Sequence, residues 1–151
     1  MPASFAFTLI STSTGSTVPA NAPFGAIAGA DAVRDFRLDA ITGDLVLDEN
    51  GDLQVISGAE GVASDIASRL QTFAGEVFLD LGIGLPYFEE ILGKHPFPRI
   101  EEIFRNAILE TPGVAGLESF SVTKTGRALA VSFRASTDFS TIIDATLNLE
   151  N

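Results

Sequence analysis

The last third of the chain alternates apolar and polar residues with a period of two, and this pattern limits the possible folds more than any other feature. In the segment STIIDATLNLEN the apolar positions are Ile143, Ala145, Leu147 and Leu149. Such alternation is typical of a half-buried β-strand, here over residues 141–149. Two earlier alternating segments, LESFSVT and RALAVSFRAST, flank a turn at 124–126. We therefore predict an antiparallel three-stranded meander whose final strand either closes its own sheet or offers an edge for pairing.

Two segments with helical periodicity precede the meander. Residues 57–76 carry an apolar stripe, Ser57 and Glu60 have the spacing of a capping box, and Gly75 suits a left-handed C-terminal cap. The stripe consists of Val62, Ile66, Leu70 and Phe73. A second helix follows Pro98 and ends before Pro112, with Glu101 and Arg105 paired on its polar face. Its apolar face consists of Ile100, Ile103, Phe104, Ala107 and Ile108.

A β-hairpin is predicted ahead of the first helix, in DLVLDENGDLQVIS. Asn50 and Gly51 tolerate the positive φ of a tight turn, with Leu45 and Leu47 opposite Leu53 and Val55. The acidic turn resembles a calcium loop only superficially, because its twelfth position is Ala59 and not the bidentate glutamate. The fold class is therefore α+β: the hairpin, two main helices with a short one between them, and the meander.

The first 30 residues carry no charged side chain. Phe5, Phe7 and Leu9 alternate as in a strand, and the following residues read as irregular extended chain. An uncharged segment in an acidic protein is expected to pack against something, either its own domain or a partner. We expect an extended arm over residues 1–35, ordered mainly by partners, and one α+β domain over residues 36–151.

Composition excludes several classes of function. The 151 residues carry 20 acidic and 9 basic side chains, a formal charge of −11, which disfavours nucleic acid and anionic membranes as partners. There is no cysteine, so thiolate metal sites and cysteine nucleophiles are impossible. We expect no metal and no cofactor.

The segment GEVFLDLGIGLPYFEEILGKHP, residues 75–96, reads either as a glycine-rich ligand loop or as a rigid connector. It contains His95, the single histidine, without the nucleophile elbow of a hydrolase, and it has no phosphate-loop motif. No pair among its carboxylates is selected by spacing. We interpret it as a connector, with His95 in a solvated turn, that holds Phe78, Tyr87 and Phe88 at fixed angles for core packing or for binding.

The chain resembles the baseplate wedge and sheath-initiator proteins of contractile phage tails, which have relatives in type VI secretion. The resemblance covers about residues 38–147. Its motif of moderate specificity is the helix end formed by Leu70, Thr72, Gly75 and Glu76, with Gly84 and the later Pro112. Some relatives carry a Glu-Pro-Arg triplet that docks on wedge partners. Here Thr111 separates Glu110 from Pro112, and Gly113 stands where the arginine would follow.

The resemblance implies a structural role and not an enzymatic one. It implies a protein of the virion tail baseplate, assembled in the host cytoplasm, that joins wedge proteins to the sheath and templates the first sheath ring by β-strand addition. The implied partners are the tail sheath protein, the baseplate wedge proteins and hub or tube proteins, in a ring with six copies expected. The expected partner-binding residues are Glu76, Phe78, Tyr87, Phe88, Glu110, Pro112, Thr141, Ile143, Ala145 and Leu147.

Two other functions remain open from the residues alone. One is a peptidoglycan-degrading, lysozyme-like tail enzyme that uses Glu76 or a neighbouring carboxylate. The other is a small-molecule binding module around the loop at residues 82–87.

Overall fold

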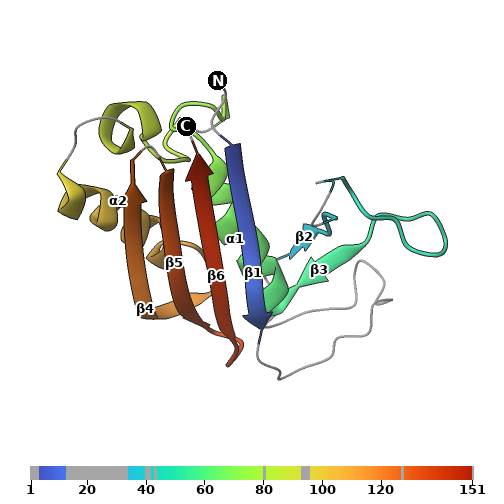
Figure 1. Cartoon of the computed structure of the whole chain (residues 1–151). Helices are drawn as coiled ribbons and strands as arrows, with labels where there is room; N and C mark the ends of the chain where they lie inside the picture. The colour runs from blue at the N-terminus through green and yellow to red at the C-terminus, as the bar shows by residue number, and fades with distance from the viewer. Residues whose placement is uncertain are drawn as a thin grey trace.

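The computed structural model describes residues 4–12, 34–39, 42, 44–79, 81–92, 96–126 and 128–150. His95 therefore lies outside the described residues, as does most of the predicted N-terminal arm. The fold is α+β, as predicted, with helices on one face of an antiparallel sheet (Figure 1). The described elements are β1 (Ser4–Thr12), β2 (Arg34–Phe36), β3 (Val55–Ser57), α1 (Gly58–Gln71), η1 (Tyr87–Ile91), α2 (Phe97–Leu109), β4 (Val114–Thr125), β5 (Ala128–Thr137) and β6 (Ile142–Glu150).

The main sheet contains the predicted meander and one further strand. Its order is β1-β6-β5-β4, and every neighbouring pair is antiparallel. The expected pairing around the turn at 124–126 is confirmed, since Phe120 lies opposite Phe133 and Val122 opposite Val131. β1 pairs with β6 from Ser4 opposite Glu150 to Thr12 opposite Ile143. The strand pattern at residues 5–9 therefore belongs to the protein's own sheet, whereas the arm boundary at residue 35 stays a prediction.

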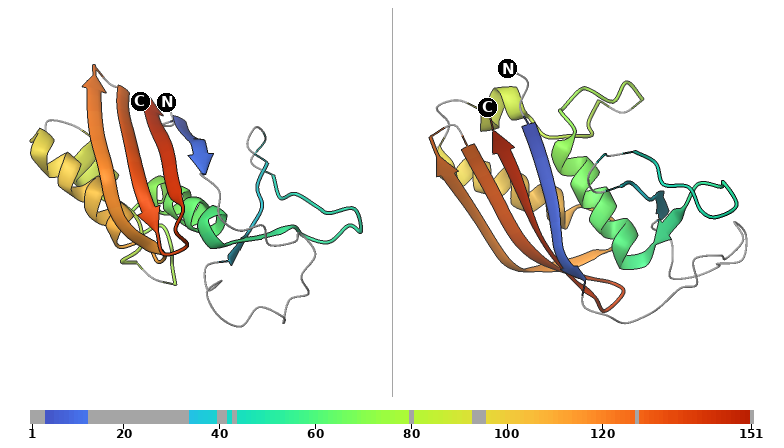
Figure 2. Two further views of the ribbon diagram at one scale, coloured as in Figure 1. Left: turned by 90° about the horizontal axis from the view of Figure 1, so that it is seen from below. Right: turned by 45° about the vertical axis from the view of Figure 1, so that its right-hand side comes forward.

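The core lies between this sheet and the two helices (Figure 2). Ile66 of α1, Phe104 of α2 and Leu147 of β6 are all fully buried. The apolar stripes of both helices and the apolar face of β6 meet there, as their periodicities predicted. Burial of each such side chain contributes about 1.5–3 kcal/mol, and this packing holds the helices on the sheet.

The first helix differs from its prediction at both ends. Ser57 is the residue before α1, but its side chain makes no capping hydrogen bond, and the Glu60 carboxylate pairs instead with Arg37 at 2.8 Å. The capping-box prediction is therefore wrong, because Arg37, the residue after β2, pairs with Glu60. The helix ends at Gln71, and Gly75 has its predicted positive φ in the turn that follows.

The small hairpin forms with a partly different register. Leu47 lies opposite Leu53 as predicted, and the Asp48 carboxylate accepts the backbone N–H groups of Asn50 and Asp52 in the turn. The expected pairing of Leu45 with Val55 is wrong. β2 inserts here, so that Leu45 faces Leu38 and Val55 faces Phe36.

Candidate protein interfaces

The end of α1 is formed by residues of the motif that the chain shares with the family it resembles. Leu70 is buried, the Thr72 hydroxyl donates to the Ser68 carbonyl at 2.7 Å, and the Glu76 carboxylate accepts the backbone N–H of Phe73 at 3.0 Å. Thr72 thereby satisfies a carbonyl in the last turn of the helix, and Glu76 fixes the turn that leaves it. The Glu76 side chain is engaged within the chain, and the residue remains solvent-exposed.

The loop after α1 folds back on the helix end at Gly84. The backbone N–H of Leu85 donates to the Thr72 carbonyl, and that of Ala74 donates to the Leu85 carbonyl, both at 2.9 Å. Gly84 has φ +100°, and a Cβ there would lie 2.5 Å from the Phe73 carbonyl oxygen. The loop therefore adopts this closed conformation only with glycine at position 84, whereas the rigidity of the connector stays a prediction.

Tyr87 does not belong to a surface. It is 1% exposed, and its hydroxyl donates to the Leu70 carbonyl at the end of α1. Burial raises the pKa of the Tyr87 phenol well above its ordinary value. The expectation that this side chain contacts a partner is therefore wrong, because its ring completes the core between Phe73 and Phe104.

Phe78 and Phe88, in contrast, lie on the surface. They are 84% and 76% exposed, and Phe88 stacks on Phe73 with the ring centroids 5.2 Å apart. Leu79 and Leu81 extend the same loop and are also largely exposed. These two leucines were not among the predicted contact residues, although the concentration of large apolar side chains between Gly75 and Gly82, without helical periodicity, could have indicated them. Several large exposed apolar side chains on one loop, such as Phe78, Leu79 and Leu81, are typical of a contact surface.

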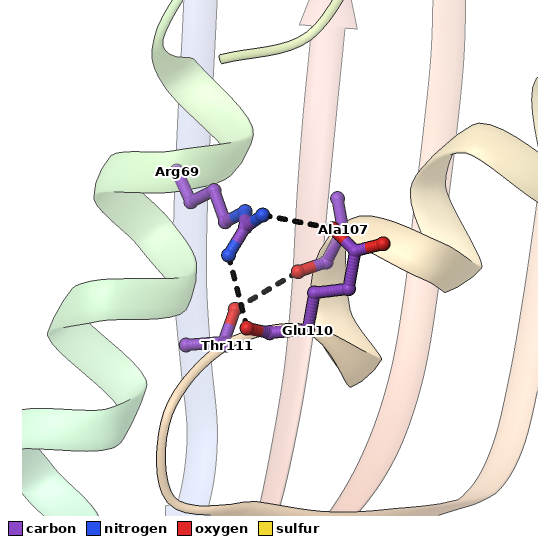
Figure 3. Close-up of polar contacts among 4 residues, drawn as sticks. All are labelled: Arg69, Ala107, Glu110 and Thr111. Atoms are coloured by element: carbon purple, nitrogen blue, oxygen red, sulfur yellow. Dashed lines mark hydrogen bonds and ion pairs between the residues drawn. The ribbon is translucent and has the colours of Figure 1, made fainter. Parts of the chain in front are cut away.

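The turn after α2 joins the two helices (Figure 3). The Arg69 guanidinium in the last turn of α1 donates to the Glu110 carboxylate at 3.0 Å and to the Glu110 carbonyl at 3.1 Å. Thr111 is buried, and its hydroxyl donates to the Ala107 carbonyl at 2.9 Å. Gly113 has φ +86°, a conformation unfavourable for the arginine of the related triplet. Glu110 and Pro112 remain exposed beside the end of α1.

The residues predicted on β6 are all buried. Ile143, Ala145 and Leu147 face the helices, and Thr141 donates its hydroxyl to the Phe139 carbonyl. Both edges of β6 are already paired, one with β5 and the other with β1. The expectation that β6 offers a free edge is therefore wrong, and the outer edges of the main sheet belong to β1 and β4.

The described part of the chain carries neither a side-chain cluster suited to a metal ion nor a helix suited to crossing a membrane. Within those residues no group of three or more histidine, aspartate and glutamate side chains could hold a metal ion. None of the described helices is both long and apolar enough to span a bilayer.

The family model described as the contractile injection system sheath initiator matches residues 34–140, from the start of β2 to the turn before β6. None of the curated proteins compared with the chain matches it.

Proposed function

The chain belongs to the family of contractile injection system sheath initiators, and from this premise we propose that it templates the first sheath ring by β-strand addition at the outer edge of β1. Membership implies a structural component of a contractile tail that interacts with the sheath. A strand added to a sheet edge binds through main-chain hydrogen bonds, which any sequence can make. The main sheet has two outer edges, so the proposal depends on choosing between them.

The observation that supports β1 is that it carries fewer of the features that protect edge strands than β4 does. Natural edge strands carry charges, proline or bulges that prevent unwanted pairing. β4 carries Glu118 and Lys124 and has two register irregularities against β5. β1, with the sequence SFAFTLIST, has no charge and no proline over nine residues, and it has one irregularity between Leu9 and Ser11. β1 is thus the less protected template.

The contact to the wedge is proposed at the end of α1. Phe78 and Phe88 supply large rigid apolar groups there, and Glu110 and Pro112 lie on the adjacent turn. Aromatic anchors of this kind commonly dominate binding energy. Because Arg69 holds Glu110 in place, the wedge would meet a preformed turn. We place the protein in the baseplate of a phage virion, in a ring of six copies that also meets hub or tube proteins, as the resemblance to phage tail proteins implies.

The edge assignment is tested by adding one lysine to each edge strand. Thr8 of β1 and Thr123 of β4 are both exposed threonines, so Thr8→Lys and Thr123→Lys form a matched pair. Lysine on an edge strand opposes strand addition but leaves the backbone donors intact. We expect sheath assembly on baseplates, counted by electron microscopy, to fall with Thr8→Lys and to stay normal with Thr123→Lys. Loss with Thr123→Lys alone would move the template to β4.

A matching experiment tests the wedge contact. Phe78→Ser is expected to weaken co-purification with wedge proteins, while Leu109→Ser, an exposed apolar residue at the end of α2, serves as the control. Equal retention of the wedge by both variants would contradict a contact at this loop.

A further inference from the structure

A second apolar surface lies at the opposite end of α1, on the small β2–β3 unit. Its residues form three cross-strand pairs: Phe36 with Val55, Leu38 with Leu45, and Leu47 with Leu53. Each of the six side chains is between 41% and 57% exposed. We call these six residues the β2–β3 apolar face. α1 has 14 residues and is about 21 Å long, so this face is separate from the Phe78 loop (Figures 1 and 2).

The orientation of this unit is the reverse of the usual one, in which the apolar face of a sheet covers the core. The residues that alternate with the apolar face point toward α1 and make polar contacts. The Ser64 hydroxyl donates to the Asp35 carboxylate at 2.5 Å, and Arg37 forms an ion pair with Glu60 at 2.8 Å. Ile56 is the buried apolar side chain of β3 on that side. These contacts fix the unit with its apolar face turned outward.

The charge around this face indicates what covers it. Between residues 38 and 68 the sequence has no lysine or arginine, whereas the turn beside the face carries Asp48, Glu49 and Asp52. The backbone N–H groups of Asp52 and Asn50 lower the pKa of the Asp48 carboxyl below its ordinary value. A second copy of the chain would bring the same carboxylates to the contact and a further charge of −11. Like charges at an interface oppose association.

We propose that the β2–β3 apolar face docks on a partner protein whose apolar contact surface is flanked by lysine or arginine side chains. This inference goes beyond the proposed function, since it involves neither the β1 edge nor the Phe78 loop. The protein would then have three contact surfaces: the β1 edge, the loop that carries Phe78, and the β2–β3 apolar face. The last two are separated by the length of α1.

The partner is identified by photo-cross-linking in the assembled particle. The chain has no cysteine, so Asn50→Cys places a single benzophenone label at the turn beside the face, and Thr125→Cys at the β4–β5 turn is the control. We expect Asn50→Cys to label a different protein at a peptide with lysine or arginine beside apolar residues. We expect Leu47→Glu to lower that yield about tenfold. Glu49→Lys should lower the cross-linking yield more than Asp138→Lys does. Both variants make the same change in net charge, but Asp138 is an exposed residue elsewhere on the protein.

Measurements on the isolated protein exclude the other occupants. Leu47→Glu should shift the Tm by less than about 2 °C if nothing in the chain covers the face. A large fall in Tm, with cross-links within the chain, would show that the chain covers its own apolar face and would overturn the proposal. If sedimentation shows a dimer and Leu47→Glu dissociates it, a second copy of the chain covers the face, and the proposal is overturned. Absence of any Asn50→Cys cross-link in the particle would overturn it as well.

Discussion

At the scale of single residues, a few side chains and one glycine set the geometry of the loop that carries Phe78. Gly84 allows the loop to approach the backbone of Phe73, and Tyr87 fills the space beneath it and caps a helix carbonyl. Each makes a contact that no other residue type could make at its position without rearrangement. Single substitutions at Gly84 or Tyr87 are therefore expected to lower the free energy of unfolding substantially.

Gly84→Ala should lower the free energy of unfolding by about 3–5 kcal/mol, because the added Cβ meets backbone atoms and the φ is positive. Gly75→Ala is the control in the same loop. Its φ is +81° but no atom lies within 4 Å of the added Cβ, so we expect only the conformational cost of about 1–2 kcal/mol. Urea unfolding followed by circular dichroism measures both. Equal losses would show that the close approach at Gly84 is unimportant.

Tyr87→Phe should cost about 1–3 kcal/mol, since it leaves the buried Leu70 carbonyl without its hydroxyl donor while the ring still fills the core. The same unfolding experiment applies. An unchanged midpoint of urea unfolding would mean that another donor reaches the Leu70 carbonyl.

Asp65 gives a pH-dependent prediction. Partial burial raises the pKa of this carboxyl, and the nearby Asp35 carboxylate raises it further, while Arg69 acts in the opposite direction. A raised folded-state pKa means that ionised Asp65 destabilises the fold above that pKa, and that the cost disappears as the pH falls through it. Asp65→Asn should therefore raise the Tm at pH 7 and have little effect at pH 3. A gain that persists unchanged at pH 3 would contradict this assignment.

At the scale of secondary structure elements, periodicity predicted the two helices and the meander because each buries one continuous face. The alternation at residues 5–9 predicted a strand, but it could not tell that β1 would pair with β6, since pairing partners distant in sequence leave no local signal. The same limit explains the missed register of the small hairpin, where β2 takes the place opposite Val55. Glu60 was assigned to a capping box because Arg37 is 23 residues away in the sequence and only the fold brings them together.

The inner position of β6 predicts a sharp response to proline. Thr146→Pro removes a backbone donor from a strand that is paired on both sides, so we expect circular dichroism to show an unfolded protein. Thr146→Ala loses only the hydroxyl contact with Ser132 at 3.0 Å and should cost about 1 kcal/mol or less. A folded Thr146→Pro variant would show that β6 is not held on both edges.

At the scale of the whole molecule, the proposed contact surfaces lie outside the core that the sheet and the two helices bury. Phe78, Phe88, Glu110 and Pro112, which were expected to contact partners, lie on the surface, and that they bind a partner stays a prediction. The connector suggested the first two residues, and the family resemblance suggested the other two. The sequence-based prediction misplaced Tyr87 and the β6 residues, because an apolar side chain in a connector or a terminal strand has the same local pattern whether the core or a partner buries it. The β2–β3 apolar face was missed for the same reason, since its outward orientation depends on the polar contacts with α1.

Addition of a sheath strand to the outer edge of β1 is the step on which the proposed role depends. The most direct measurement is a cryo-electron microscopy map of the baseplate with its first sheath ring, at a resolution that traces main chain. We predict a sheath strand beside β1 at the spacing of paired strands, about 4.8 Å, which extends the order β1-β6-β5-β4 by one. A sheath strand beside β4, or a β1 edge without sheath backbone at pairing distance, would contradict the account.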